Sequence, residues 1–327
     1  REALRRFVDT EIMPYADDWD EAGAIPNTLW PKAAAVGLLG LGYPEQFGGT
    51  PADSWHSWIV NEELSRVGVG GVSASLMVHG IGLPPVLNWG PEEMQAEVAL
   101  PVLRGEKWIS LGITEPGGGS DVANLATTAI RDGDHYVISG SKTYITGGMR
   151  ANWVSTAVRT GGPGAAGVSM LLIPTDADGF SRTPLDRKMG WWASDTATLY
   201  LDEVRVPVAN LIGAENEGFR VIMTNFNSER MGMAAAMEAY ARVCLEEAVA
   251  WATERETFGK RLADHQVIRH KIAQMKQQLN ATQAYIRLCY ESIEAGTPNP
   301  GDIALLKVQA SEVMEFCARE AMQILGG

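Results

Sequence analysis

A glycine-rich segment in the middle of the chain combines residue types that suit a large polar ligand. Residues 111–121 read Leu-Gly-Ile-Thr-Glu-Pro-Gly-Gly-Gly-Ser-Asp, with three consecutive glycines between an apolar run and a Ser-Asp pair. Glycine lets backbone N–H groups approach a ligand closely, and Thr114 and Ser120 add hydroxyl groups. The usual nucleotide-binding patterns, Gly-Lys-Ser/Thr and G-x-G-x-x-G, are not found here. The segment is a candidate ligand loop, and a plain surface turn is the alternative.

The composition is that of a soluble globular protein and argues against several functions. With 327 residues the chain is long enough for about two or three domains, and 46% of it is hydrophobic and 20% charged. The formal net charge of −13 disfavours nucleic acid as a partner, because its phosphates require clustered Lys and Arg. No apolar run reaches the roughly 18 residues of a membrane helix and no secretory signal is visible, so we expect no membrane span.

The cysteines and histidines indicate a reducing compartment and no metal site. The chain has 3 cysteines, too few and too far apart for a disulfide framework. Cys244, Cys289 and Cys317 each fall on an apolar helical stripe, so we expect them in the core. His265 and His270 are five residues apart, which places them on different faces of a helix. We therefore expect no bound metal.

The hydrophobic pattern predicts helices, then strands, then helices. Residues 1–108 carry apolar residues at spacings of three and four, as amphipathic helices do. Residues 109–212 contain short β-type runs separated by turn residues, which is typical of an antiparallel sandwich or barrel. Residues 213–327 contain three long apolar stripes, which make up most of a helical bundle. The chain is thus predicted to be an α+β multidomain protein with an N-terminal helical domain, a central β-sandwich or barrel and a C-terminal helical bundle.

The same pattern gives expectations for individual elements. In the first C-terminal helix, the stripe that runs from Met233 through Tyr240 to Trp251 should face the core. Asp264 and Asp302 are expected to cap the next two helices. Strands are expected at residues 126–130, 134–139, 153–159, 168–174 and 198–201.

Several further segments support the glycine-rich loop as a functional motif. Residues 113–121 resemble the signature of the acyl-CoA dehydrogenase family, and other segments resemble that family in the same order along the chain. These are residues 140–147, 188–196, 204–207, 210–211, 217–219, 255–260, 265–266 and 323–327. The resemblance covers essentially the whole chain. It implies the fold of that family, with a bundle that looks truncated before its last helix.

The resemblance implies an FAD-dependent enzyme that converts an acyl-CoA thioester to a 2,3-enoyl-CoA. In this reaction a carboxylate removes the α-proton and a β-hydride passes to flavin N5. FAD would lie between the β domain and the bundle, and hydrogen-bond donors would polarise the thioester carbonyl. The resemblance also implies an electron-transfer flavoprotein as electron acceptor and a homodimer or homotetramer. It implies a location in the bacterial cytoplasm or, for a eukaryote, in the mitochondrial matrix.

Residue by residue, the resemblance implies contacts with FAD from several segments. Thr114 and Thr146 would hydrogen-bond the flavin ring, and Tyr144 would pack against it where many relatives have Trp. Ser120 would contact the FAD pyrophosphate or the acyl-CoA, and Arg255 would reach the pyrophosphate of FAD in a neighbouring subunit. Taken alone, Tyr144 is an ordinary strand aromatic and Arg255 a solvated charge. The complete implied set is Leu111, Ile113, Thr114, Gly119, Ser120, Tyr144, Ile145, Thr146, Arg255, Thr257, Phe258, Gln266, Gln323, Gly326 and Gly327.

The catalytic base is expected at Glu229 rather than at Glu115 of the glycine-rich loop. Many members of the family supply the base from a loop after the last bundle helix, which this sequence does not include. Others, including the isovaleryl-CoA type, supply it from a Glu-Arg pair on the first bundle helix, the place of Glu229 and Arg230. Burial should raise the pKa of such a base, and Asn227, Arg230 and Ser120 would bind the acyl-CoA. The alternative is that Glu229 stabilises a helix start as an acidic first-turn residue.

Two other functions fit the same residues. Flavin oxidases and flavin-dependent monooxygenases share the fold and use oxygen instead of a protein acceptor, and rapid oxidation of the substrate-reduced protein by air would favour them. A non-catalytic acyl-CoA-binding scaffold would keep the fold without the chemistry. Bleaching of a bound flavin on addition of acyl-CoA would exclude the scaffold.

Overall fold

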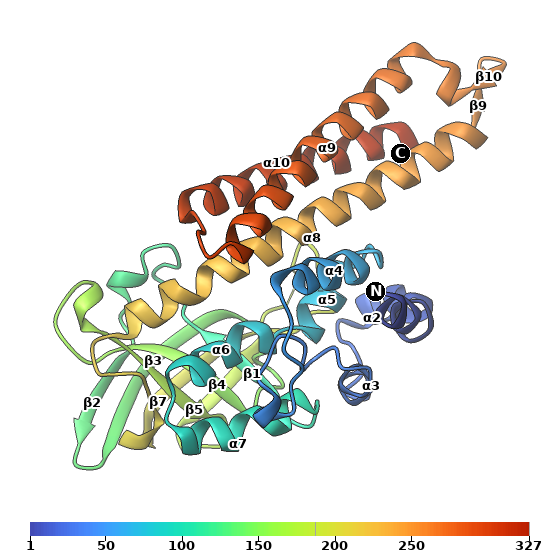
Figure 1. Ribbon diagram of the computed structural model, residues 1–327. Helices are drawn as coiled ribbons and strands as arrows, with labels where there is room; N and C mark the ends of the chain where they lie inside the picture. The colour runs from blue at the N-terminus through green and yellow to red at the C-terminus, as the bar shows by residue number, and fades with distance from the viewer. Residues whose placement is uncertain (187, 327) are drawn as a thin grey trace. The chain divides into compact units, whose positions relative to one another are not determined.

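Helices come first in the chain, a β-sheet follows and long helices come last, as the computed structural model shows for residues 1–186 and 188–326 (Figure 1). The predicted α+β class is confirmed by this order of helical, sheet and helical parts. The chain forms two compact units. The larger comprises Glu2–Pro51 and Val69–Phe226, and the smaller comprises Arg1, Ala52–Gly68 and Asn227–Gly327. These units cut across the three predicted segments, because residues 52–68 cluster with the C-terminal helices.

The helices of the larger unit are short. They are α1 (Glu2–Phe7), α2 (Ala16–Ala22), α3 (Leu29–Ala35), α5 (Gly70–Leu76), α6 (His79–Trp89) and α7 (Glu92–Leu103). Helix α6 packs directly on the first strand of the sheet. A Cβ atom on Gly82 would come within 2.9 Å of the Ile109 carbonyl oxygen, so only glycine permits this approach.

One segment of the larger unit, Gly70–Trp89, has the length and composition of a membrane helix, with a mean hydropathy of 1.3. From the sequence we expected no apolar segment of this length. In the structure it is divided between α5 and α6, and 61% of its apolar window is buried inside the protein. Leu76, Leu83 and Val86 are completely buried, so packing in the core accounts for its apolar character.

The strands of the larger unit join in one eight-stranded sheet. They are β1 (Ile109–Gly112), β2 (Thr128–Asp132), β3 (His135–Thr146), β4 (Trp153–Arg159), β5 (Val168–Pro174), β6 (Phe180–Pro184), β7 (Thr196–Pro207) and β8 (Leu211–Ile212). The order is β6-β7-β3-β2-β4-β5-β8, and β1 pairs in parallel with β4. Strands β4 and β5 have the predicted bounds, whereas β3 and β7 are longer than expected and β6 was not predicted.

The sheet bends so that its two halves share one core, as the predicted sandwich or barrel requires. A buried cluster joins Ile138 of β3 and Val204 of β7 with Val158 of β4 and Leu171 of β5. These two pairs of strands lie on either side of β2 in the strand order. They can share one core only if the sheet bends, so that alternate side chains of each strand face inward.

The smaller unit consists of α4 and the long helices near the end of the chain, except that residues 218–226, the start of α8, belong to the larger unit. Their bounds are α4 (Ser54–Ser65), α8 (Gly218–Glu254), α9 (Gln266–Glu294) and α10 (Pro300–Leu325). A hairpin of β9 (Glu256–Thr257) and β10 (Lys260–Arg261) joins α8 to α9. Leu245, Met275 and Val313 pack together in one buried cluster of α8, α9 and α10. Cys289 and Cys317 are buried as predicted, and Cys244 is half-buried.

The predicted stripe of α8 is only partly right. Tyr240 is buried as expected, but Met233 and Trp251 are 44% and 39% exposed, and the buried face also includes Met231, Ala234, Ala241 and Leu245. Small alanines let the helices approach closely, whereas the prediction favoured the larger side chains.

The expected caps at Asp264 and Asp302 are wrong. His265 occupies the N-cap position of α9, and the Asn299 side chain caps α10 by accepting a hydrogen bond from Gly301 N–H. Asp302 lies in the first turn of α10, where a negative charge is also favourable.

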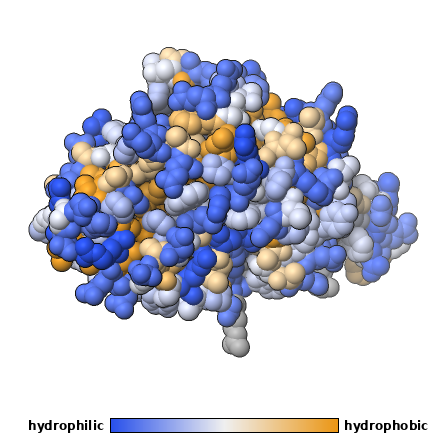
Figure 2. All heavy atoms as spheres, turned by 90° about the horizontal axis from the view of Figure 1, so that it is seen from below, coloured by the Kyte–Doolittle hydropathy of each residue, from blue (hydrophilic) through white to orange (hydrophobic). Residues whose placement is uncertain are grey.

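Apolar side chains also reach the protein surface. Figure 2 shows hydrophobic patches scattered among mostly polar atoms on one face. On α9 and α10, Leu288, Leu305 and Met322 are 59%, 63% and 71% exposed. Exposed apolar side chains of this size can serve contacts with other chains when they form a patch.

Candidate active site

The glycine-rich loop is closed by its own backbone and has an open side. It follows β1, and Glu115 and Gly118 exchange two backbone hydrogen bonds of 3.0 Å. Gly117 and Gly118 have open space where a side chain would lie, and Ser120 is exposed. Gly119 packs on Thr114, since a Cβ atom there would be 3.1 Å from Thr114 Cγ2. A ligand can therefore approach the backbone of this loop closely.

Glu115 holds the loop in place through a buried ion pair. Its carboxylate accepts hydrogen bonds from Ala126 N–H at 2.6 Å, from Thr127 N–H at 2.9 Å and from Lys142 Nζ at 2.7 Å. Lys142 is completely buried and also donates to the Ile113 carbonyl. Burial would raise the pKa of Glu115, but the hydrogen bonds and the charge of Lys142 outweigh it and lower this pKa to about 2. Glu115 is thus ionised and fully partnered, which suits a structural role and not that of a base.

Tyr144 lies in a β-bulge with its ring exposed. Lys142 pairs with Leu199 and Ile145 with Ala197, so β3 carries one residue more than β7 between the two pairs. Tyr144 adopts φ of 58°, in the left-handed region, which costs an L-residue roughly 1–2 kcal/mol. Its side chain is 64% exposed. Because strained residues cluster at functional sites, the bulge is a second feature that singles out this segment.

The loop and the bulge lie side by side in the larger unit. Thr143 N–H donates to the Thr114 carbonyl at 2.8 Å, and Thr146 accepts a hydrogen bond from Ser110 Oγ through its own carbonyl at 2.8 Å. The structure thus brings the predicted residues Thr114, Tyr144 and Thr146 together.

The apolar residues of the predicted set are placed differently. Ile113 and Ile145 are 9% and 2% exposed, so they can offer a ligand their backbone but not their side chains. Leu111 is half-buried on β1.

Glu229 lies on α8, well inside a helix that begins at Gly218. The alternative of an acidic first-turn residue therefore does not apply. Burial raises the pKa of Glu229 to about 7, and the Arg230 guanidinium opposes this shift. Arg230 also donates to Asn227 Oδ1 at 3.0 Å. A carboxyl group with this pKa can accept a proton near neutral pH, which is what a general base requires.

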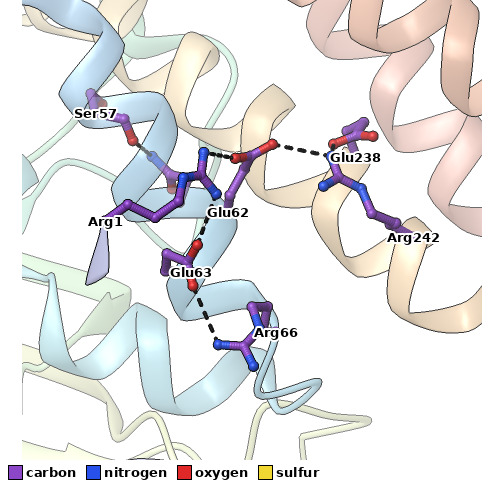
Figure 3. Close-up of polar contacts among 8 residues, drawn as sticks. Arg1, Ser57, Glu62, Glu63, Arg66, Glu238 and Arg242 are labelled. Carbon is purple, nitrogen blue, oxygen red and sulfur yellow. Dashed lines mark hydrogen bonds and ion pairs between the residues drawn. The ribbon is translucent and has the colours of Figure 1, made fainter. Parts of the chain in front are cut away.

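A partly buried charge network joins α8 to α4 within the smaller unit (Figure 3). Arg242 of α8 donates to Glu238 at 2.6 Å and to Glu62 of α4 at 3.1 Å. Arg1 donates to Glu62 at 2.5 Å and to Glu63 at 2.8 Å. The three carboxylates are buried, and buried charges are tolerated only when they are paired. The network therefore fixes the helix that carries Glu229.

The connection from α8 to α9 places other predicted FAD residues on the surface. Phe258 lies between β9 and β10 with φ of 53°, and its side chain is 97% exposed. Arg255 and Gln266 are exposed, and Thr257 Oγ1 lies 3.3 Å from His265 Nε2. Exposure of a whole phenyl ring to water is unfavourable, so this segment suits contact with another molecule.

The end of α10 carries the last predicted residues. Gln323 and Gly326 are exposed, and Gly326 has φ of 83°. Gly327 lies outside the described residues.

We predicted no role for Lys142 and Thr143 from the sequence, although both lie in residues 140–147, one of the motifs named above. The alternation of side chains along β3 could have predicted that Lys142 is buried, because Lys142 shares the buried face of the strand with Tyr136 and Ile138. A lysine on a buried face requires a carboxylate partner. The bulge that follows has no comparable signal, since Thr-Tyr-Ile-Thr is an ordinary strand sequence.

A cavity of about 550 Å³ opens in the larger unit beside the start of β7. Its lining includes Met149, Lys188, Trp192 and Thr196, and none of the predicted site residues. Thr196 pairs with Thr146 across β7 and β3, so the cavity lies one strand away from the Tyr144 segment.

Known proteins match this chain along nearly its whole length. Three family models match it: the acyl-CoA dehydrogenase N-terminal domain at residues 1–106, the middle domain at 110–204 and the C-terminal domain at 216–327. An acyl-CoA dehydrogenase of Alternaria alternata, AFT10-1, is 36% identical, with 100% of this chain and 81% of the relative covered.

Solved structures agree with this result. A probable acyl-CoA dehydrogenase from Mycobacterium abscessus has 45% identity and a TM-score of 0.97, covering 100% of this chain and 87% of that one. A glutaryl-CoA dehydrogenase from Mycobacterium smegmatis, in complex with FADH2, has 28% identity and a TM-score of 0.93, covering 100% and 83%.

Proposed function

We propose that this chain, which belongs to the acyl-CoA dehydrogenase family, uses Glu229 as the base of an α,β-dehydrogenation that yields a 2,3-enoyl-CoA. Enzymes of this family are FAD-dependent oxidoreductases that act on acyl-CoA thioesters. The observation that carries the proposal is the pKa of Glu229, which burial raises to about 7. A solvated glutamate would be a much weaker base at neutral pH.

The larger unit has the groups that would hold FAD. Thr114 and Thr146 would hydrogen-bond the flavin ring, Tyr144 would lie against it, and Ser120 would meet the pyrophosphate or the acyl-CoA. The open side of the glycine-rich loop and the exposed ring of Tyr144 fit such a ligand. Leu111, Ile113, Gly119 and Ile145 would add backbone contacts. Bound FAD supplies the acceptor for the β-hydride.

In the smaller unit, Glu229 would take the α-proton, and Arg230 with Asn227 would bind the acyl-CoA. Burial is the main cause of the raised pKa of Glu229. A bound apolar acyl chain would exclude more water and strengthen the carboxylate as a base. Arg230 limits this shift, which keeps a useful fraction of the carboxyl ionised at neutral pH.

The remaining residues of the smaller unit support an oligomeric enzyme. Arg255, Phe258 and Gln266 are exposed, and we propose that they, with Thr257, reach FAD in a neighbouring subunit. Gln323 and Gly326 would contact its adenosine half. This arrangement requires a homodimer or homotetramer. An electron-transfer flavoprotein would then accept the electrons.

Anaerobic addition of a panel of acyl-CoA thioesters to the FAD-loaded protein tests this function. At least one member of the panel should bleach the flavin and lose two hydrogens, as mass spectrometry of the thioester would reveal. Slow reoxidation in air, together with fast reoxidation by an electron-transfer flavoprotein, is expected. Absence of bleaching with every chain length would favour a scaffold, and fast reoxidation by air alone would favour an oxidase or monooxygenase.

A further inference from the structure

Thr143 lies at the centre of the contacts around the β-bulge. It directly precedes Tyr144, the strained residue, and its own side chain is buried. Its N–H donates to the Thr114 carbonyl at 2.8 Å. Its Oγ1 lies 3.0 Å from Thr198 Oγ1 of β7, and either hydroxyl can be the donor. One residue thus joins the glycine-rich loop, the bulge and the neighbouring strand.

The preceding residue makes a parallel set of bonds. Lys142 Nζ donates to the Ile113 carbonyl at 3.1 Å and to Glu115 Oε1 at 2.7 Å. Lys142 and Thr143 therefore hold the consecutive residues from Ile113 to Glu115. The loop and the bulge cannot shift independently while these bonds are intact.

Among these contacts, the hydrogen bond between the Thr143 and Thr198 hydroxyls joins the bulge to β7 through side chains. Without it, β3 would still pair with β7 at Lys142 and Ile145, and Ile145 would still pack against Ala197, but Thr143 would lose its side-chain bond to β7. A strand without the bulge would relieve the left-handed conformation of Tyr144, so something must oppose that change. The hydroxyl pair opposes it, because breaking the pair would leave the buried Thr143 hydroxyl without this partner, while Thr198 is half-buried.

We propose that Thr143 and Thr198 are positioning residues for the flavin: their hydroxyl–hydroxyl bond holds the bulge so that the Tyr144 ring and Thr114 keep one fixed placement toward FAD. Neither threonine needs to touch the cofactor. The inference rests on the proposed contacts of Tyr144 and Thr114 with FAD. It predicts that this bond contributes to FAD affinity.

A double-mutant cycle measures the contribution of the bond. Thr143→Val and Thr198→Val keep the side-chain shape and remove the hydroxyls. FAD is titrated into each apoprotein, and the dissociation constant and the visible spectrum of the bound flavin are recorded. Each single variant should weaken FAD binding by about tenfold, and the double variant should be no weaker than either single, because both remove the same bond. Thr143→Ser, which keeps the hydroxyl, should bind within about twofold of the wild type.

Two controls separate positioning from other effects. Thr128→Val removes a half-buried hydroxyl of β2 that donates a long hydrogen bond of 3.4 Å to the Ser139 carbonyl, and should leave FAD binding unchanged. Thermal unfolding of each apoprotein shows whether a variant is merely less stable. A lower melting temperature with an unchanged dissociation constant and spectrum would overturn the inference.

Tyr144→Leu separates the positioning role of Thr143 and Thr198 from the proposed contact of Tyr144 with the flavin. If this variant binds FAD as the wild type does, the proposed contact of Tyr144 with the flavin is wrong, and the inference fails with it. If Tyr144→Leu weakens FAD binding but Thr143→Val and Thr198→Val do not, the contact stands and the positioning role is wrong. Additive losses in the double variant would also contradict a shared bond.

Discussion

At the level of single residues, two glutamates have opposite pKa shifts because their surroundings differ. Glu115 is surrounded by hydrogen-bond donors and a lysine, which lower its pKa to about 2. For Glu229, burial is the largest influence and outweighs the opposing charge of Arg230, so its pKa is raised to about 7. Environments that separate the pKa values of like groups are typical of enzymes. Here they assign a structural role to the first glutamate and support a chemical role for the second.

The raised pKa of Glu229 predicts a pH dependence. A base must be deprotonated to act, so kcat/KM should rise with pH below about 7 and level off above it. Steady-state kinetics across this range would measure the profile. Glu247→Gln changes an exposed residue of the same helix and should leave the profile unchanged. A rate that is flat across pH 7 would contradict the assignment of Glu229.

The lowered pKa of Glu115 predicts a loss of stability in acid. Its folded-state pKa lies below the ordinary value of 4.5. The stabilisation is therefore complete above pH 4.5 and is lost as the pH falls toward about 2. Glu115→Gln should remove this dependence from the free energy of unfolding. It should also cost about 3–5 kcal/mol at neutral pH, because Lys142 would be left buried without a counter-charge.

Denaturant unfolding as a function of pH measures both effects. Asp202→Asn changes an exposed carboxylate of the same unit and serves as the control. Lys142→Met combined with Glu115→Gln should be more stable than Glu115→Gln alone. Equal stability of Glu115→Gln and the wild type at neutral pH would show that the ion pair does not hold the loop.

At the scale of elements, the charge network of α4 and α8 determines how firmly the Glu229 helix is held. Arg242→Met would leave Glu62 without one partner and Glu238 without its partner in the network. We expect the free energy of unfolding to fall by about 2–3 kcal/mol, somewhat less than for a fully buried pair, because the Arg242 side chain is 34% exposed. Chemical denaturation followed by helical circular dichroism measures this loss.

Arg287 provides a matched comparison on α9. It forms an ion pair with Glu291 at 2.9 Å in which both side chains are mostly exposed. Arg287→Met should therefore change the stability by less than about 0.5 kcal/mol. If the two variants lose the same stability, the buried network has no special role in holding α8.

Element prediction from the sequence succeeded where one physical signal dominated. Strands β4 and β5 are short runs of mostly apolar and β-branched residues between turn residues, and their predicted bounds are those of the structure. The bulge at Tyr144 was not predictable, because it depends on tertiary bonds of Thr143 rather than on local sequence. The cap at Asn299 was missed because Asp302 is also a good capping residue, and only the start of the helix decides between them.

At the scale of the whole molecule, the order of helical, sheet and helical parts followed from the change in hydrophobic period along the chain. The motifs of the candidate site were also found in the sequence, since they are short and contiguous. The two compact units were not found in the sequence, because residues 52–68 join the C-terminal helices through contacts between residues far apart in the chain. Long-range packing of this kind leaves little trace in a local pattern.

We have proposed Glu229 as the base of acyl-CoA dehydrogenation. Rapid anaerobic mixing of the FAD-loaded protein with its best acyl-CoA substrate tests it, with the flavin absorbance as the signal. Glu229→Gln should still bind the thioester but reduce the flavin at least about a hundredfold more slowly, while Glu247→Gln should match the wild type. Flavin reduction by Glu229→Gln at nearly the wild-type rate would show that Glu229 is not the base.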